Sequence, residues 1–139
     1  MDLEAYRKTF NKTSNFLQLI GAELTVLREG YAQVELVSQE KHRNVNGTVH
    51  GGILFSLADT AVGAASKSGG RASVTLEGKL NMIRPASVEE ERLTAVAKEL
   101  HGGRRTGVYE CRILGGGGKL VAEGLYTMFM LDETVEQGG

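Results

Sequence analysis

The sequence predicts one α+β domain, in which a central helix is followed by a run of long antiparallel strands. Three observations predict this fold class. Residues 51–67 place apolar side chains at helical spacing. The strand-like segments after residue 70 are not separated by helices, which disfavours a doubly wound parallel sheet. The length of 139 residues is about that of one domain, so we expect residues 1–139 to fold as a single unit.

The N-terminal part of the chain predicts a helical segment, a hairpin and a loop. Residues 1–20 carry apolar side chains three or four positions apart, which favours one amphipathic helix or two short ones. Residues 22–36 alternate apolar and polar side chains around Glu29-Gly30, a pattern typical of a hairpin. The polar residues 37–49 then predict a loop of about 12 residues, and loops of this length often have a function.

The spacing of apolar side chains in the rest of the chain predicts the central helix and the strands after it. The apolar stripe of residues 51–67 consists of Leu54, Leu57, Ala58, Ala61 and Ala65. Asp59 lies about 140° round the helix from Leu54, so it leaves this stripe. It shares a face with Gly52, Phe55, Ser56 and Gly63. Strands are expected at residues 72–84, 93–100, 106–114 and 120–131.

Composition excludes several functional classes. Sixteen Lys and Arg against seventeen Asp and Glu give a formal charge of −1, whereas a nucleic-acid-binding protein normally carries a basic stripe. Cys111 is the single cysteine, so no intrachain disulfide can form, and the first residues do not resemble a secretion signal. We therefore expect a cytoplasmic protein. The weakly polar stretch 51–66 contains Asp59 and is shorter than a membrane span, so no membrane partner is expected.

Two possible ligand motifs do not match their patterns. The glycines of 115–118 precede Lys119, but Leu120 stands where a phosphate loop needs Ser or Thr for magnesium, so a hairpin turn is the better interpretation. The three histidines and the cysteine do not have the spacing of a zinc site: His42, His50, His101 and Cys111. We expect no bound metal.

The junction between the polar loop and the central helix is the strongest candidate for chemistry. A helix N-terminus offers unpaired backbone N–H groups, and Gly51 and Gly52 would let a ligand approach them closely. Such a site can hold a developing oxyanion. Two turns further on, Asp59 could act as a general base or as a nucleophile on an acyl carbon. The alternative is a solvated carboxylate on the exposed side of the helix, and only the adjacent loop favours the catalytic interpretation.

The residues around this junction resemble the signature of a known family. The first part of the pattern is His42-x-Asn44-x-x-Gly47-x-x-His50-Gly51-Gly52, followed by Leu57-Ala58-Asp59-Thr60-Ala61. Downstream, Thr75, the segment 80–86, the segment 103–106 and the segment 118–122 agree with it in order and spacing. Together they resemble the PaaI-type hotdog-fold acyl-CoA thioesterases over most of the chain from His42 to Leu131.

The resemblance implies a hotdog fold, in which a long antiparallel sheet wraps around the central helix. It also implies self-association as a homodimer or a homotetramer, and hydrolysis of the thioester of a small aryl or medium-chain acyl-CoA. The active site would lie between subunits, where Asn44 and Gly51 of one subunit meet the partner subunit's Asp59 and Thr75. Coenzyme A would be part of the substrate, so no separate cofactor is expected.

The resemblance assigns roles to five residues. Asp59 would be the base or nucleophile, and the Gly51 N–H would polarise the thioester carbonyl. Asn44 would orient the attacking water or the carboxylate, Thr75 would hydrogen-bond the same group, and His50 would shape the turn that aims the Gly51 N–H. Because thiolate is a good leaving group, one carboxylate and one oxyanion donor are sufficient for thioester hydrolysis.

The phosphates of coenzyme A need cations, for which Arg84, Arg104 and Arg105 are candidates, with Lys79 and Lys119 as weaker ones. Two alternatives remain for the function. A non-catalytic acyl-CoA-binding module would need an output domain, and about 20 residues before Gly21 are too few for a helix-turn-helix. A hotdog dehydratase would need a histidine paired with an acid, whereas His50 lies beside a glycine turn.

Overall fold

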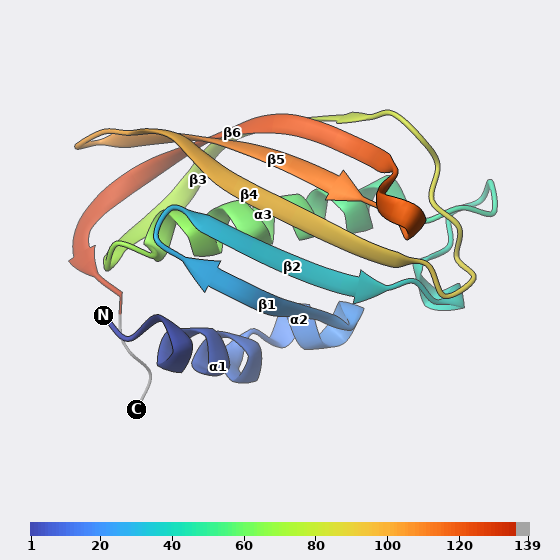
Figure 1. Ribbon diagram of the computed structural model, residues 1–139, viewed down its shortest axis with the longest axis horizontal. Coiled ribbons are helices and arrows are strands. Elements are labelled where there is room, and N and C mark those ends of the chain that lie inside the picture. Colours follow the sequence, from blue (N-terminus) through green and yellow to red (C-terminus); the bar gives the residue numbers. More distant parts are fainter. Residues whose placement is uncertain (136–139) are drawn as a thin grey trace.

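The computed structural model describes residues 1–135 and shows a six-stranded antiparallel sheet curved around one long helix (Figure 1). The helices are α1 (Leu3–Thr13), α2 (Asn15–Ile20) and α3 (Gly51–Lys67), and the short 3-10 turns are η1 (Glu40–His42) and η2 (Gly116–Gly118). The strands are β1 (Ala22–Arg28), β2 (Tyr31–Val37), β3 (Arg71–Met82), β4 (Arg92–Gly102), β5 (Thr106–Leu114) and β6 (Leu120–Thr134). The predicted α+β class and the central helix are confirmed, and each predicted strand is found within a few residues of its expected bounds.

The strands follow the order β1-β2-β4-β5-β6-β3 across the sheet. The chain therefore leaves the β1–β2 hairpin, crosses the sheet as α3 and returns as β3 at the opposite edge. Within residues 1–135, β3 pairs only with β6, so its outer edge carries unpaired backbone groups. An unpaired edge of twelve residues is an available surface for pairing with another chain.

The core lies between α3 and the concave side of the sheet. The predicted stripe is confirmed, since Leu54, Leu57, Ala58, Ala61 and Ala65 are each at most 3% exposed. Burial extends further round the helix to Val62, Ala64 and Ser66, because the sheet curls over most of its circumference. Asp59 lies on the remaining side and is half-buried.

The N-terminal segment forms two helices that lie along β1 (Figure 1). The carboxamide of Asn11 donates to the carbonyl of Leu24 and accepts from its N–H, which fixes α1 against that strand. Ser14 separates α1 from α2, and Gly21 ends α2 in the left-handed conformation at φ 80°. No helix in residues 1–135 has both the length and the apolarity needed to cross a bilayer.

Candidate active site

The N-terminus of α3 leaves one backbone donor free. His50 is the N-cap residue, with φ −59° and ψ 135°, and its Nδ1 accepts a hydrogen bond from Gly52 N–H at 2.8 Å. Its carbonyl accepts from Ile53 N–H at 2.9 Å. Gly51 N–H has no hydrogen-bond partner among the described residues. The imidazole thus satisfies the second N–H of the helix and leaves the first one available to a ligand.

A second histidine, which the residue pattern alone did not single out for a role, holds this turn in place. His42 is 2% exposed, and its Nδ1 accepts from Gln39 N–H at 2.9 Å. Its Nε2 lies 2.7 Å from the carbonyl of Ile20, so Nε2 carries the proton. The His42 carbonyl in turn accepts from His50 N–H at 2.8 Å. His42 therefore connects the end of α2 to the residue that caps α3.

The side chain of Asn44 closes the loop before α3. Its Oδ1 accepts from Asn46 N–H at 2.9 Å and from Thr48 N–H at 3.0 Å. Its Nδ2 donates to Thr48 Oγ1 at 3.0 Å, which leaves one amide hydrogen for another group. Gly47 completes the turn at φ 87°, in the left-handed region that favours glycine. Asn44 thus supports the loop that presents Gly51.

Asn44 and Gly51 line a hollow of about 240 Å³, which we call the helix-terminal hollow, together with Arg84 and Met82. The sulfur of Met82 covers Gly51, since a Cβ added at Gly51 would lie 2.9 Å from Met82 Sδ. Glycine at position 51 therefore leaves room for the Met82 side chain beside the free N–H.

Asp59 and Thr75 meet in a different hollow, of about 270 Å³, which we call the mid-helix hollow. Thr75 Oγ1 donates a hydrogen bond of 2.7 Å to Asp59 Oδ1. β3 runs beside α3, and Thr75 lies next to a register shift, between Thr75 and Glu77, in the pairing of β3 with β6. The predicted pairing of Asp59 with Thr75 is therefore found within one chain, and it orients the carboxylate.

The mid-helix hollow also contains residues that the sequence pattern did not indicate. Phe10 and Ser14 reach it from the N-terminal helices, and Lys67 reaches it from the last turn of α3. Burial lowers the pKa of the Lys67 ammonium, and the negative charge of Asp59 acts in the opposite direction. The tertiary structure brings Phe10 and Ser14 to the carboxylate, whereas Lys67 lies on the same helix as Asp59.

Tyr126 lies in the sheet near Asp59. Its ring contacts Phe55, with ring centroids 5.4 Å apart, and occupies the space where a side chain at position 78 would lie. Burial raises the pKa of Tyr126, and the neighbouring acidic groups of Cys111 and Asp59 raise it further. In the described part of the chain, its hydroxyl is the buried side-chain polar atom without a hydrogen-bond partner.

The two hollows are too far apart to act on one thioester within one chain. Gly51 and Asp59 are eight positions apart on α3, which corresponds to about 12 Å along the helix axis. A nucleophile and an oxyanion donor must both lie about 3 Å from the reacting group. One chain therefore keeps the Gly51 donor and the Asp59 carboxylate apart.

The three arginines predicted for phosphate binding do not cluster within one chain. Arg84 lies by the helix-terminal hollow, after the end of β3. Arg104 and Arg105 lie in the β4–β5 turn, where the Arg104 carbonyl accepts from Arg71 Nη1 at 2.9 Å and Arg105 faces Asp132 at 3.6 Å. Arg71 begins β3, so the length of this strand, roughly 35 Å, separates the two groups. A single chain cannot bring all three to one pyrophosphate.

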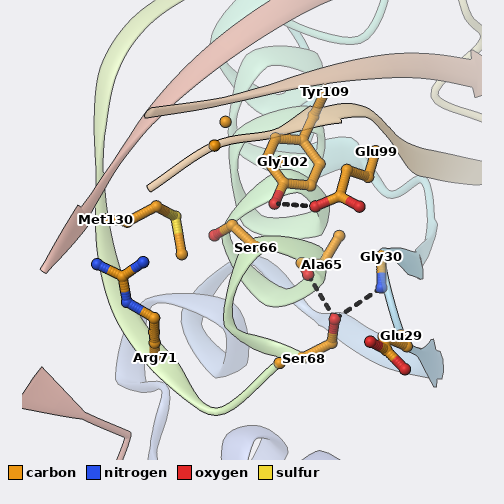
Figure 2. A pocket seen from close by; sticks show the side chains of 13 residues that line it. Glu29, Gly30, Ala65, Ser66, Ser68, Arg71, Glu99, Gly102, Tyr109 and Met130 are labelled. Carbon is orange, nitrogen blue, oxygen red and sulfur yellow. Dashed lines mark hydrogen bonds between the residues drawn. The ribbon is translucent and has the colours of Figure 1, made fainter. Parts of the chain in front are cut away.

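A third hollow, of about 230 Å³, lies at the C-terminal end of α3 and is lined by none of the predicted site residues (Figure 2). Ser68 Oγ donates to the Ala65 carbonyl at 2.7 Å and accepts from Gly30 N–H at 2.7 Å. Tyr109 donates to Glu99 at 3.2 Å. The Ser68 bonds tie the β1–β2 turn to the end of α3, and the Tyr109 bond links β5 to β4, so these contacts have a structural role.

Comparisons with known proteins agree with the fold and identify the family. The family model described as Thioesterase superfamily matches residues 46–122, and a model described as a domain of unknown function matches residues 4–82. A putative esterase of Archaeoglobus fulgidus is 34% identical over 94% of this chain and 84% of its own length. The acyl-coenzyme A thioesterase PaaI of Escherichia coli is 37% identical over 74% of this chain and 73% of its own.

Solved structures show the same architecture. The E. coli PaaI protein from the phenylacetic acid degradation operon superposes with a TM-score of 0.91 at 29% identity, over 96% of each chain. A hypothetical thioesterase of Streptococcus pneumoniae, solved with coenzyme A, superposes with a TM-score of 0.75 at 30% identity, over 79% of this chain and 88% of its own. The curved sheet around α3 is therefore the hotdog fold. The chain belongs to the thioesterase superfamily, as a PaaI-type hotdog enzyme that hydrolyses thioesters.

Proposed function

We propose that this protein hydrolyses acyl-CoA thioesters at a site made by two copies of the chain. The observation that carries the proposal is that the two groups needed for the reaction lie in separate hollows of one chain. The free Gly51 N–H lies in the helix-terminal hollow and the Asp59–Thr75 pair in the mid-helix hollow, about 12 Å apart on α3. A second copy can bring its helix-terminal hollow to the mid-helix hollow of the first and so complete one site.

The edge strand β3 is the surface through which we expect the two copies to meet. Its outer edge is unpaired in residues 1–135, and exposed apolar side chains lie along and just beyond it: Val74, Leu76, Met82 and Ile83, each at least 50% exposed. Antiparallel pairing of two β3 edges would continue the sheet across the dimer and cover these side chains. A homotetramer could form from two such dimers.

In this dimer, each catalytic group has a defined task. Gly51 N–H, at the positive end of α3, donates to the thioester oxygen as negative charge develops on it. Asp59, held by Thr75, either takes a proton from the attacking water or attacks the carbonyl carbon itself. The carbon–sulfur bond then breaks, and water supplies the oxygen of the free acid and the proton of the coenzyme A thiol. The remaining Asn44 amide hydrogen is available to the attacking water or to the partner subunit's Asp59.

Two findings on the S. pneumoniae relative support this assignment. It binds coenzyme A, and two variants of it have been solved in which an aspartate and a threonine sixteen positions apart are replaced by alanine. Asp59 and Thr75 are also sixteen positions apart. For the phosphates of coenzyme A we favour Arg84, which is exposed at the helix-terminal hollow, over Arg104 and Arg105 at the other end of the sheet.

Complementation between two inactive variants tests the shared site. Asp59→Ala removes the carboxylate, and Gly51→Pro removes the N–H at a helix position that tolerates proline. When the two variants are unfolded together and refolded in equal amounts, half of the dimers are mixed, and each mixed dimer has one intact site. We expect release of free thiol from acyl-CoA at about one quarter of the wild-type rate.

The wild-type chain, refolded in the same way, sets the reference rate. A mixture that stays as inactive as either variant alone would show that Gly51 and Asp59 do not act together across a dimer. Failure of the wild-type chain to release thiol from any acyl-CoA would disprove the proposed activity itself.

A further inference from the structure

Lys67 places an unpaired positive charge in the same hollow as Asp59. Its side chain lines the mid-helix hollow, and no carboxylate lies within 4.0 Å of its ammonium in the part of the chain that the structure describes. The Nζ atom donates one hydrogen bond, to the Gly63 carbonyl at 3.2 Å. An ammonium has three donors, so two remain for a ligand.

The bond to Gly63 fixes where this charge lies relative to Asp59. The lysine side chain folds back along α3 by one turn, so that its Nζ lies beside Gly63. Gly63 follows Asp59 by four positions, which is about 6 Å along the helix. The positive charge therefore lies about one turn beyond the carboxylate.

The surroundings make this charge costly to leave without a partner. The side chain is half-buried, and burial disfavours the charged form of the amine. Besides Asp59 and Lys67, the hollow is lined by apolar side chains from three elements, Phe10 of α1, Val74 of β3 and Met128 of β6, and by the hydroxyl side chains of Ser14, Thr60, Ser73 and Thr75. A ligand that fits has an apolar body and an anionic or accepting end.

We propose that Lys67 binds the far end of the acyl group, and that the preferred substrates are thioesters of short dicarboxylic acids. This inference rests on the proposed acyl-CoA hydrolysis. With the thioester carbon at Asp59, the methylene groups lie along Phe10, Val74 and Met128, and the terminal carboxylate accepts hydrogen bonds from Nζ. An extended chain advances about 1.2 Å per bond, so a span of about 6 Å corresponds to acids of five or six carbons.

A matched pair of substrates tests the proposal: adipyl-CoA, which ends in a carboxylate, and hexanoyl-CoA, which has the same chain length and ends in a methyl group. Hydrogen bonds to a charged group support a preference of about 10- to 100-fold in kcat/KM for adipyl-CoA. Lys67→Met keeps the apolar stem and removes the charge, so we expect it to abolish this preference while hexanoyl-CoA hydrolysis stays within about twofold. Lys67→Arg retains the positive charge, and we expect it to retain most of the preference.

Three results would overturn the proposal. One is a wild-type enzyme that does not distinguish the two esters. Another is a Lys67→Met variant that loses activity equally on both, which would assign Lys67 to the chemistry at Asp59. The third is a Lys67→Met variant that, in calorimetry, binds free coenzyme A and both thioesters more weakly than the wild type by the same factor. That result would place a coenzyme A phosphate at Lys67. Because the calorimetry does not require turnover, it decides the role of Lys67 even if the proposed hydrolysis fails.

Discussion

The two hollows along α3 are built in opposite ways. The helix-terminal hollow offers a backbone N–H, and its side chains act on their own loop: His50 caps Gly52, and Asn44 holds Thr48 and Asn46. The mid-helix hollow offers side chains, with a carboxylate fixed by Thr75 and a lysine without an ion-pair partner within the described residues. In the proposed reaction, the N–H of the helix-terminal hollow stabilises a negative oxygen. The carboxylate of the mid-helix hollow acts on the carbon that bears this oxygen, as a base for water or as a nucleophile.

This difference explains why the site is divided. An oxyanion donor is best taken from a helix terminus, where the N–H is fixed and unpaired. A base needs a side chain that can approach the substrate from the other face of the carbonyl. A straight helix cannot place both groups around one carbon, because they are two turns apart. In the proposed dimer a second copy of the helix resolves this constraint, and four variants test the separate contributions.

The largest effect is expected at Asp59. Asp59→Ala should lower kcat by about a thousandfold, because it removes the base or nucleophile. The fold should persist, since the side chain is half-buried and its hydrogen bond is to Thr75. Thiol release measures the rate, and circular dichroism checks the fold. Asp132→Ala, at the far end of the sheet, is the matched control and should retain full activity; undiminished turnover in Asp59→Ala would disprove the mechanism.

Removal of the Gly51 N–H should have the next largest effect. Gly51→Pro should lower kcat by about 100-fold, the effect of losing one oxyanion donor. The helix should tolerate the ring, because proline is favoured at the first helical position and His50 already has the extended ψ of 135° that precedes proline. Gly51→Ala keeps the N–H and meets the same Met82 side chain, so it separates the donor from crowding. Equal losses in both variants would contradict a donor role.

A smaller effect is expected at Thr75. Thr75→Ala removes the 2.7 Å hydrogen bond to Asp59 and should lower kcat about tenfold, with little change in KM, because the carboxylate loses its orientation. Thr75→Ser keeps the hydroxyl and should restore most of the rate. A change confined to KM would assign Thr75 to substrate binding instead.

The smallest effect is expected at His50, and it concerns stability. His50→Ala removes the bond from Gly52 N–H to Nδ1 and should lower the free energy of unfolding by about 1 kcal/mol, seen as a drop in Tm. His50→Asn supplies another acceptor at the N-cap and should recover most of this loss. An unchanged Tm in His50→Ala would show that the cap does not stabilise α3.

Much of the fold was predictable because its signals are local. The apolar stripe from Leu54 to Ala65 specified α3, and the alternation around Glu29-Gly30 specified the hairpin. The adjacency of a polar loop and two glycines at a helix start likewise indicated the free N–H of Gly51, since helix termini always leave such donors. The roles of His42 and Lys67 were not predictable in this way, because His42 bonds to Ile20, 22 positions away, and the hollow around Lys67 is lined by Phe10, Val74 and Met128 from other elements.

The sequence by itself determined which segments become helix or strand and where a backbone donor and a carboxylate lie on α3, because periodicity and capping act over a few residues. The tertiary structure decided what surrounds them. Only the passage of β3 beside α3 brings Thr75 to Asp59, and only the docking of α1 on β1 brings Phe10 to the same hollow. These contacts join residues far apart in the chain, so they depend on how the sheet curves around the helix and not on local pattern.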